Sequence, residues 1–192
     1  MSNKHGRRGF FKEALSQILQ PVAEILEKPD PAIVEMPAAM LLRPPGALPE
    51  EEFLEKCLRC GNCVKNCPAE AILPLESDDP GLMQTPYINP TLQPCVICDS
   101  LACMYVCPSG ALQSVFAEDI AMGIAVFTAD TCLRSKEITC TYCVDSCPIG
   151  EDAITFSPTG LVEVLTPGCT GCGVCQHVCP TSPKSIVIEP LR

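Results

Sequence analysis

The first regular pattern of apolar residues lies near the start of the chain. Between residues 10 and 26, apolar side chains recur three and four positions apart, which is the spacing of one helix face. They are Phe11, Leu15, Ile18, Leu19, Val22, Ile25 and Leu26. Glutamate and glutamine lie between them, so the pattern predicts an amphipathic helix within residues 1–28, which Pro21 would kink. Such a helix suits peripheral contact with a membrane through residues 10–26, or packing against a partner or the rest of the chain.

After this helix the pattern becomes irregular, and the predicted elements are short. Six prolines between residues 29 and 49 predict an extended tether. Further on we predict a helical turn over 50–56, a connector over 73–94 with a turn at 78–81, strands over 111–116, 125–128 and 185–188, and a hairpin of 153–156 with 161–165. This mixture of short strands and helices predicts an α+β domain over residues 50–192.

The composition narrows the classes of partner. The 192 residues allow one domain or two small fused ones, and they include no tryptophan and only 5% aromatic residues. The formal net charge is −10 and no basic stripe is present, so we expect no nucleic acid partner. The longest apolar run, residues 120–129, is about half as long as a membrane span, so we predict no transmembrane segment.

Sixteen cysteines dominate the chemistry, and they form four motifs that each end in Cys-Pro. The motifs are Cys57, Cys60, Cys63 and Cys67; Cys95, Cys98, Cys103 and Cys107; Cys132, Cys140, Cys143 and Cys147; and Cys169, Cys172, Cys175 and Cys179. The first and fourth have the spacing C-x2-C-x2-C-x3-C-P, whereas one interval is x4 in the second and x7 in the third. A short loop after each Cys-Pro leads to an apolar residue, namely Ile72, Leu112, Ile154 or Ile186. We therefore predict four copies of one unit.

This spacing is typical of the cysteines that bind [4Fe–4S] clusters in bacterial ferredoxins. Disulfides explain it poorly, because cysteines so close in sequence do not pair well with each other. Structural zinc sites use separated pairs of cysteines and do not require a third and fourth cysteine followed by proline. We predict four [4Fe–4S] clusters in tandem ferredoxin-like units, with all sixteen cysteines as iron ligands. Because the clusters would occupy much of the core, we expect the apo-protein not to fold stably.

Other candidate groups are few. Arg134 and Lys136 lie in an insertion of the third motif, which we interpret as a solvated loop, with an effect on a nearby cluster as the alternative. His177 is interpreted as a bystander, since the fourth motif already supplies four cysteines. We find no dinucleotide-binding motif and no free catalytic pair, so we predict no catalytic residues and an electron-transfer subunit rather than a complete enzyme.

The N-terminus carries a possible export signal. Residues 6–12 resemble a twin-arginine signal, with Arg7 and Arg8 as the pair. Polar residues interrupt the apolar stretch that follows, and no small-x-small cleavage site precedes Arg43. A periplasmic location and a cytoplasmic or peripheral-membrane location therefore both stay open.

The motifs and the segments between them resemble the ferredoxin-type proteins of periplasmic nitrate reductase and methylamine utilisation systems, the NapG/MauM group. The resemblance runs from Leu42 to the C-terminus. It rests on the x7 spacing and on R-P-P-G-A-L at 43–48, T-P-Y at 85–87, C-P-S-G-A-L at 107–112, M-G-I-A-V at 122–126 and C-T-G-C-G-V-C at 169–175. It implies a relay of single electrons from a membrane quinol-oxidising partner to a c-type cytochrome or terminal reductase. An assembly or maturation role for a metalloenzyme is the alternative.

The resemblance also implies how the motifs share ligands. The fourth cysteine of such a motif normally binds the neighbouring cluster, and the resemblance pairs the first motif with the fourth and the second with the third. The implied sets are Cys57, Cys60, Cys63 and Cys179; Cys169, Cys172, Cys175 and Cys67; Cys95, Cys98, Cys103 and Cys147; and Cys132, Cys140, Cys143 and Cys107. Sequential pairing, first with second and third with fourth, stays open as the alternative.

Overall fold

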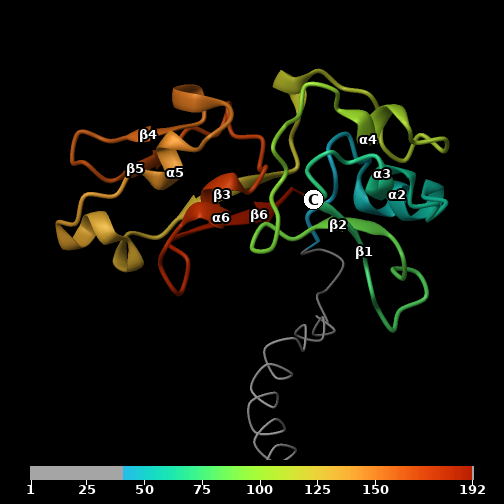
Figure 1. The fold of residues 1–192 in the computed structure, drawn as a ribbon, viewed down its shortest axis with the longest axis horizontal. Helices are drawn as coiled ribbons and strands as arrows, with labels where there is room; N and C mark the ends of the chain where they lie inside the picture. The colour runs from blue at the N-terminus through green and yellow to red at the C-terminus, as the bar shows by residue number, and fades with distance from the viewer. Residues whose placement is uncertain (1–40, 192) are drawn as a thin grey trace, which may run out of the picture. The chain divides into compact units, whose positions relative to one another are not determined.

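The structure is a computed structural model, and it describes residues 41–191 (Figure 1). These residues belong to one compact unit. The predicted amphipathic helix, the arginine pair and residues 29–40 of the tether lie outside the described residues. The assignment of these N-terminal segments stays a prediction.

Helices and strands in the described part are short. The helices are α2 (Glu50–Lys56), α3 (Asn62–Lys65), α4 (Ala102–Tyr105), α5 (Tyr142–Asp145) and α6 (Val174–Val178), with 3-10 turns η2 (Ala117–Asp119), η3 (Ala129–Thr131), η4 (Leu133–Lys136) and η5 (Gly150–Asp152). The strands are β1 (Ile72–Pro74), β2 (Pro86–Ile88), β3 (Gly123–Phe127), β4 (Ile154–Phe156), β5 (Val162–Val164) and β6 (Ile186–Pro190). Helices this short are not stable alone in water, so they depend on the packing around them.

The strands pair two by two into three antiparallel ladders within the described residues (Figure 1). β1 pairs with β2 and β4 pairs with β5, in each case over a short connection. β3 pairs with β6 although the two strands are far apart in sequence, with Phe127 opposite Ile186. This last ladder ties the C-terminal strand to the segment that precedes the third cysteine motif.

The four cysteine motifs share one local geometry. The apolar residue that follows each Cys-Pro is at most 3% exposed and is paired with another segment. Ile72, Ile154 and Ile186 begin β1, β4 and β6, whereas Leu112 forms an isolated bridge with Ala47. A small buried residue precedes each of them, namely Ala71, Ala111, Ala153 or Ser185. The mixed short helices and strands agree with the predicted α+β class.

Most predicted elements have a counterpart, but one strand does not. The turn at 50–56 is α2, the hairpin is β4 with β5, and the strands at 125–128 and 185–188 fall on β3 and β6. The strand predicted over 111–116 is wrong, because Leu112 makes a single bridge there. The segment around Ala47, which forms this bridge with Leu112, contains Pro44, Pro45 and Pro49, and prolines lack the N–H groups that a ladder needs. The connector over 73–94, by contrast, contains most of β1 and all of β2.

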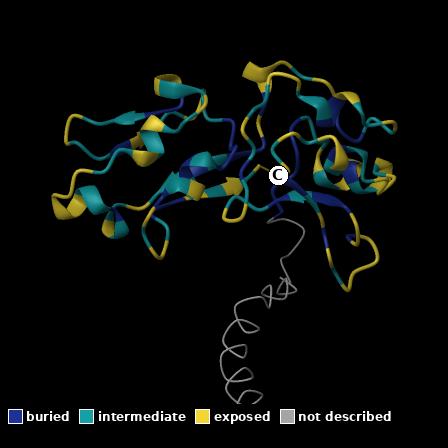
Figure 2. Ribbon diagram, viewed as in Figure 1, coloured by how far each residue is buried: buried dark blue, intermediate teal, exposed yellow. Residues whose placement is uncertain are grey.

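Residues 41–49, which the sequence assigned to the tether, pack into the protein. The first five of them are buried (Figure 2). The backbone N–H of Ile88 donates to the carbonyl oxygen of Leu42 at 2.8 Å, which adds residue 42 to the edge of the β1–β2 ladder. The folded domain therefore includes residues before 50, where the sequence placed its start.

Arg43 holds this segment in place. Its guanidinium forms two hydrogen bonds with the carboxylate of Glu50, from Nε at 2.9 Å and from Nη2 at 2.5 Å. Nη1 donates to Thr85 Oγ1 at 3.0 Å and to the carbonyl oxygen of Pro86 at 2.8 Å. The guanidinium also lies 4.7 Å from the centroid of the Phe53 ring. The residue thus joins the segment before α2, the start of α2 and β2.

Replacing this arginine is expected to weaken the fold. Arg43→Met keeps the apolar stem but removes every hydrogen bond of the guanidinium, so we expect the free energy of unfolding to fall by about 2–4 kcal/mol. The matched control is Lys56→Met, which removes the exposed ion pair of Lys56 with Glu52 at 3.8 Å and is expected to cost less than about 1 kcal/mol. Thermal unfolding of both variants with iron bound measures the difference. Equal midpoints for the two variants would contradict the structural role of Arg43.

Two groups of buried side chains form the core around the motifs, and each includes cysteines. The first contains Phe53, Ile72, Ile88 and Leu112 together with Cys63, Cys103 and Cys172. The second contains Ile154, Val162 and Ile186 together with Cys175 and Cys179. Ile188 packs against both groups, so the β3–β6 ladder lies between them.

Candidate iron–sulfur cluster sites

The backbone of each motif separates the fourth cysteine from the first three. In the first and fourth motifs a glycine in the left-handed region, Gly61 or Gly173, precedes the short helix that carries the third cysteine. At Gly173 a Cβ atom would lie 2.6 Å from the Cβ of Pro90, so no larger residue fits there. Each helix ends before the fourth cysteine, and the proline that follows cannot continue it. The fourth thiol is therefore placed away from the other three.

One cavity combines cysteines of the first and second motifs. It is lined by Cys67, Cys95, Cys98 and Cys103, and we call these four residues site B. Its remaining walls are largely apolar and include Ile72 and Leu101. Burial, together with the smaller effect of the charges on neighbouring thiols, raises the pKa of Cys95 to about 12.

Two further cavities combine cysteines of the third and fourth motifs. Site C consists of Cys147, Cys169, Cys172 and Cys175, and site D consists of Cys132, Cys140, Cys143 and Cys179. In each cavity, three cysteines come from one motif and the fourth comes from the other. The combination of three cysteines from one motif with one from its neighbour is therefore found both in the first two motifs and in the last two.

The remaining four cysteines form the counterpart of site B, and we call them site A: Cys57, Cys60, Cys63 and Cys107. Burial raises the pKa of Cys63 to about 12, and the charges of Cys57 and Cys107, which are both near enough to act on it, contribute to this value. Asn62 Nδ2 donates to the carbonyl oxygen of Val106 at 3.5 Å, which holds α3 beside the residue that precedes Cys107.

This grouping corrects the ligand sharing that the resemblance implied. Pairing the first motif with the fourth is wrong for this structure, because Cys67 lines one cavity with Cys95 and Cys98 whereas Cys169 lines another. The same holds for the second motif with the third, since Cys147 lies in site C. The physical cause is the β1–β2 ladder, which folds the chain back after the first motif and brings the second motif beside it. The sequential alternative is the one that the structure supports.

Three observations test whether these sites fit [4Fe–4S] clusters. All sixteen cysteines are free thiols. Within residues 41–191, no three cysteine, histidine or carboxylate groups converge closely enough to hold one metal ion, which a tetrahedral zinc site requires. The cysteines as described are therefore not arranged as sites for single ions.

The third observation is a buried hydroxyl at site C. Thr170 is 5% exposed and lines this cavity. Its hydroxyl lies near enough to Cys172 to favour the thiolate there, against the larger effect of burial, but it makes no hydrogen bond of acceptable geometry in the structure. Buried hydroxyls are nearly always paired, and the sulfur atoms of a cluster would accept this one. The four sulfur sets thus fit [4Fe–4S] clusters.

The protonation of the cysteines depends on their position in the motif. Burial raises the pKa of Cys103 and Cys143 to about 11, so iron binding at these positions must displace protons. At Cys107 and Cys179 burial also raises the pKa, but hydrogen bonds from neighbouring groups outweigh it and lower the pKa of both. These two are fourth cysteines whose sulfur contacts a side-chain hydroxyl, from Ser109 and Thr181 respectively.

Direct contacts arrange the four sites in a series. Sites A and B share the first and second motifs, and sites C and D share the third and fourth. The N–H of Cys95 in site B donates to the carbonyl oxygen of Cys172 in site C at 3.0 Å, and the charges of these two cysteines interact. Cys143 of site D similarly raises the pKa of Cys175 of site C, after burial and its own neighbours. The order along the protein is therefore A, B, C, D.

Several residues at these sites were missed or misread from the sequence. Arg134 is not part of a solvated loop: it donates to the carbonyl oxygens of Gly160 and of Cys140, and its guanidinium lies 4.1 Å from the ring centroid of Phe156. It lines site D and joins the insertion to the β4–β5 hairpin. The hydroxyls of Ser109, Thr170 and Thr181 carried no sequence signal except their closeness to a cysteine.

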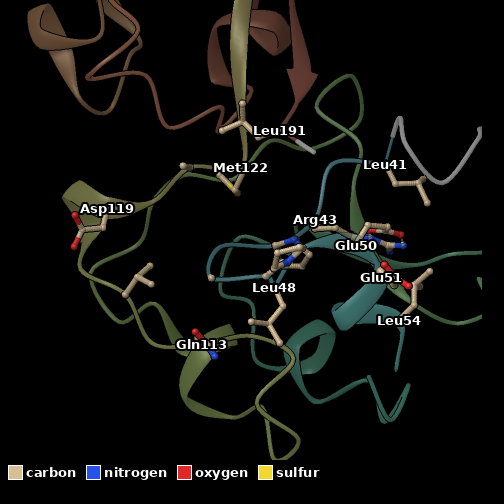
Figure 3. Close-up of a pocket in the computed structure, with 16 residues that line it drawn as sticks. Leu41, Arg43, Leu48, Glu50, Glu51, Leu54, Gln113, Asp119, Met122 and Leu191 are labelled. Atoms are coloured by element: carbon tan, nitrogen blue, oxygen red, sulfur yellow. Dashed lines mark hydrogen bonds and ion pairs between the residues drawn. The ribbon is translucent and has the colours of Figure 1, made fainter. Parts of the chain in front are cut away.

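A separate cavity of about 790 Å³ contains no cysteine (Figure 3). Its charged side chains do not form a catalytic pair, because Arg43 and Glu50 are bonded to each other and Asp119 lies on the opposite wall from Glu51 (Figure 3). We assign no chemistry to it. Among residues 41–191, the helices are too short and too polar for any of them to cross a membrane.

Comparison with known proteins gives two kinds of match. Two family models described as 4Fe-4S dicluster domains match residues 56–111 and residues 125–187. Each match contains eight cysteines, the first and second motifs in one and the third and fourth in the other, which supports four [4Fe–4S] clusters and agrees with the sequential grouping.

Two relatives match most of the chain. The methylamine utilization ferredoxin-type protein MauM of Methylobacillus flagellatus is 39% identical over 164 residues, which cover 80% of this chain and 70% of that protein. The ferredoxin-type protein NapG of Escherichia coli is 38% identical over 164 residues, which cover 78% of this chain and 71% of that protein.

Proposed function

The chain belongs to the MauM and NapG group of ferredoxin-type iron–sulfur proteins, and we propose that it relays single electrons between a membrane quinol-oxidising partner and a c-type cytochrome or terminal reductase. A [4Fe–4S] cluster supplies the chemistry, since it takes up and releases one electron at a time. The electron-transfer function is favoured over the maturation alternative by the family membership.

The observation that carries this proposal is the series of four cysteine quartets. Site A holds Cys57, Cys60, Cys63 and Cys107; site B holds Cys67, Cys95, Cys98 and Cys103; site C holds Cys147, Cys169, Cys172 and Cys175; and site D holds Cys132, Cys140, Cys143 and Cys179. We propose these four sets as the iron ligands. A continuous series suits a relay, whereas a protein that only stores iron has no need of one.

The protein's own residues position and insulate these sites. The backbone hydrogen bond between Cys95 and Cys172 holds sites B and C next to each other. It therefore joins the half of the series that contains sites A and B to the half that contains sites C and D. Apolar walls such as Ile72 and Ile188 exclude water from sites B and C, which protects buried thiolates and tunes the reduction potential.

Exposed side chains lie beside both ends of the series. Cys60 of site A is exposed, and Leu58 beside it is 66% exposed. At the other end, Tyr142 is 59% exposed between Cys140 and Cys143 of site D. Exposed apolar side chains beside a redox site are suited to contact with partner proteins. We therefore propose sites A and D as the ends at which electrons enter and leave.

The test is electron flow between purified components. Membranes that contain the quinol-oxidising partner are mixed anaerobically with the iron-loaded chain and a c-type cytochrome, and quinol is added. We expect the cytochrome to be reduced at least about tenfold faster than without the chain, because the reaction otherwise lacks its carrier. The chain stripped of iron is the control. If quinol leaves the cytochrome oxidised while dithionite still reduces the chain's clusters, the proposed donor is wrong.

A further inference from the structure

A hydroxyl group stands beside the fourth cysteine in two of the four motifs. The second residue after that cysteine is Ser109 in the second motif and Thr181 in the fourth, but Ala69 in the first and Ile149 in the third. Each loop leads from Cys-Pro to a small buried residue and then to a buried apolar residue, which is five positions after the cysteine in the first two motifs and seven in the last two. Within each pair of equal length, one loop has a hydroxyl at the second position after the cysteine and the other does not.

The Thr181 hydroxyl has two possible acceptors for its proton. Its oxygen accepts the backbone N–H of Ser185 at 3.0 Å, and it lies 2.8 Å from Ser185 Oγ and 3.2 Å from the sulfur of Cys179. An iron-bound thiolate accepts hydrogen bonds and cannot donate one, whereas Ser185 Oγ can do either. All three contacts are satisfied when Ser185 Oγ donates to Thr181 and Thr181 donates to the sulfur, and this is the arrangement that we adopt.

Ser109 repeats the arrangement with longer contacts. Its hydroxyl oxygen accepts the N–H of Ala111 at 3.4 Å and lies 3.6 Å from the sulfur of Cys107. Cys107 also accepts the N–H of Leu112 at 3.4 Å. In the first motif the N–H of Ala71, which corresponds to that of Ala111, donates directly to the sulfur of Cys67 at 3.4 Å, because no hydroxyl lies between them.

We propose that Thr181 and Ser109 are positioning residues that raise the reduction potentials at sites D and A, through hydrogen bonds to the sulfur atoms of Cys179 and Cys107. The proposal rests on the ligand sets given above. Reduction adds negative charge at the site, and a hydrogen bond to a ligand sulfur stabilises the more negative state. The two ends of the series are thereby distinguished from sites B and C at their fourth ligand.

The experiment is a reductive titration of the full iron-loaded chain, followed by electron paramagnetic resonance, together with an iron assay. In Thr181→Val the hydroxyl is replaced by a methyl group of similar size. We expect the ratio of reduced to oxidised cluster at site D to fall about tenfold at a fixed ambient potential, which is 59 mV for one electron. Thr181→Ser is expected to restore most of the ratio, and Ser109→Ala to give a smaller fall at site A because its contacts are longer.

A reciprocal variant covers the case in which Thr181→Val fails to retain its cluster. Residues 70 and 110 both have positive φ, 52° for Glu70 and 70° for Gly110, so the first and second loops share their backbone form. Ala69→Ser therefore places a new hydroxyl beside Cys67 and is expected to raise the potential at site B. Ser100→Ala is the comparison variant: this hydroxyl lies 3.7 Å from the sulfur of Cys98 but is exposed, so water competes with the sulfur for its proton and we expect a smaller effect than that of Ser109→Ala.

The outcomes separate this proposal from the proposed function. If Thr181→Val keeps about 16 iron atoms per chain with an unchanged potential, the role of the hydroxyl is overturned while the relay still stands. An unchanged potential in Ala69→Ser overturns it as well. A wild-type chain that binds far fewer iron atoms would contradict the ligand sets themselves.

Discussion

Stripping the iron from this protein is expected to abolish its cooperative fold. Within residues 41–191 its helices have at most seven residues and its sheets have two strands each, and neither kind of element is stable alone. Both core groups contain cysteine side chains among their buried members, and the chain has no tryptophan. Without a cluster, each of the four sites leaves an unfilled space between thiols that must then be protonated.

Amide hydrogen exchange measures this effect most directly. The clusters are removed anaerobically with a chelator and reductant, and exchange is followed in peptides that cover β3 and β6. These strands pair over five residues and lie between the two core groups, so they are expected to be the most protected part of the iron-loaded protein. We expect their protection to fall at least about a hundredfold once the iron is gone.

The control is the same protein after the clusters have been rebuilt with iron and sulfide. It should regain the protection of β3 and β6, because the loss comes from the missing clusters and not from chemical damage. Persistent protection of this ladder in the iron-free chain would contradict the expectation. It would show that the apolar side chains alone, such as Ile186 and Ala125, hold the second core group together.

The sequence predicts each cysteine motif well because the residues that define a motif lie close together in the chain. The spacing of each motif, the proline after it and the apolar residue that follows lie within about twenty residues, and each motif folds as its spacing indicates. Ile72, Ile154 and Ile186 begin strands for the same reason, since each follows a short loop after Cys-Pro. The identity of the cofactor follows from the same short patterns.

The sharing of ligands between motifs was not predictable in this way. The fourth-cysteine rule states that Cys67 serves a neighbouring cluster, but it does not state which neighbour. That choice depends on the β1–β2 ladder, whose strands lie in a stretch that the sequence indicated only as a connector. Pro74 and Pro86 stand opposite each other at the end of this ladder, and prolines in both strands conceal it from a search for alternating residues.

The segment before α2 illustrates a second limit. Prolines at 44, 45 and 49 indicate an extended chain, and the backbone there does lack regular structure. Its burial depends on contacts with distant residues, among them those of Arg43 with Thr85 and Pro86, which are more than forty residues away. No local pattern identifies such partners, so an extended segment within a domain resembles a tether outside it.

Replacing Cys67 is expected to remove one whole cluster, and combining this change with a second one identifies which cluster is lost. Cys67→Ala should lower the iron content by about four atoms per chain, because site B loses a ligand. Adding Cys98→Ala should remove no further iron, since Cys98 belongs to the same site. Adding Cys169→Ala instead should remove about four more atoms, since Cys169 belongs to site C.

The pairing of the first motif with the fourth gives the reverse pattern, because Cys67 and Cys169 would then share one cluster. Under either grouping, the iron contents of the two double variants differ by one cluster, but the variant that loses more iron is not the same. An iron assay is therefore sufficient to distinguish the two groupings. The same logic applies to Cys147→Ala, which should lose no more iron with Cys169→Ala but a second cluster with Cys98→Ala. Sites that share no ligand should lose iron independently. If the variants of Cys67 and those of Cys147 agree, sites A and B form one half of the series and sites C and D the other, and the two halves meet at the Cys95–Cys172 hydrogen bond.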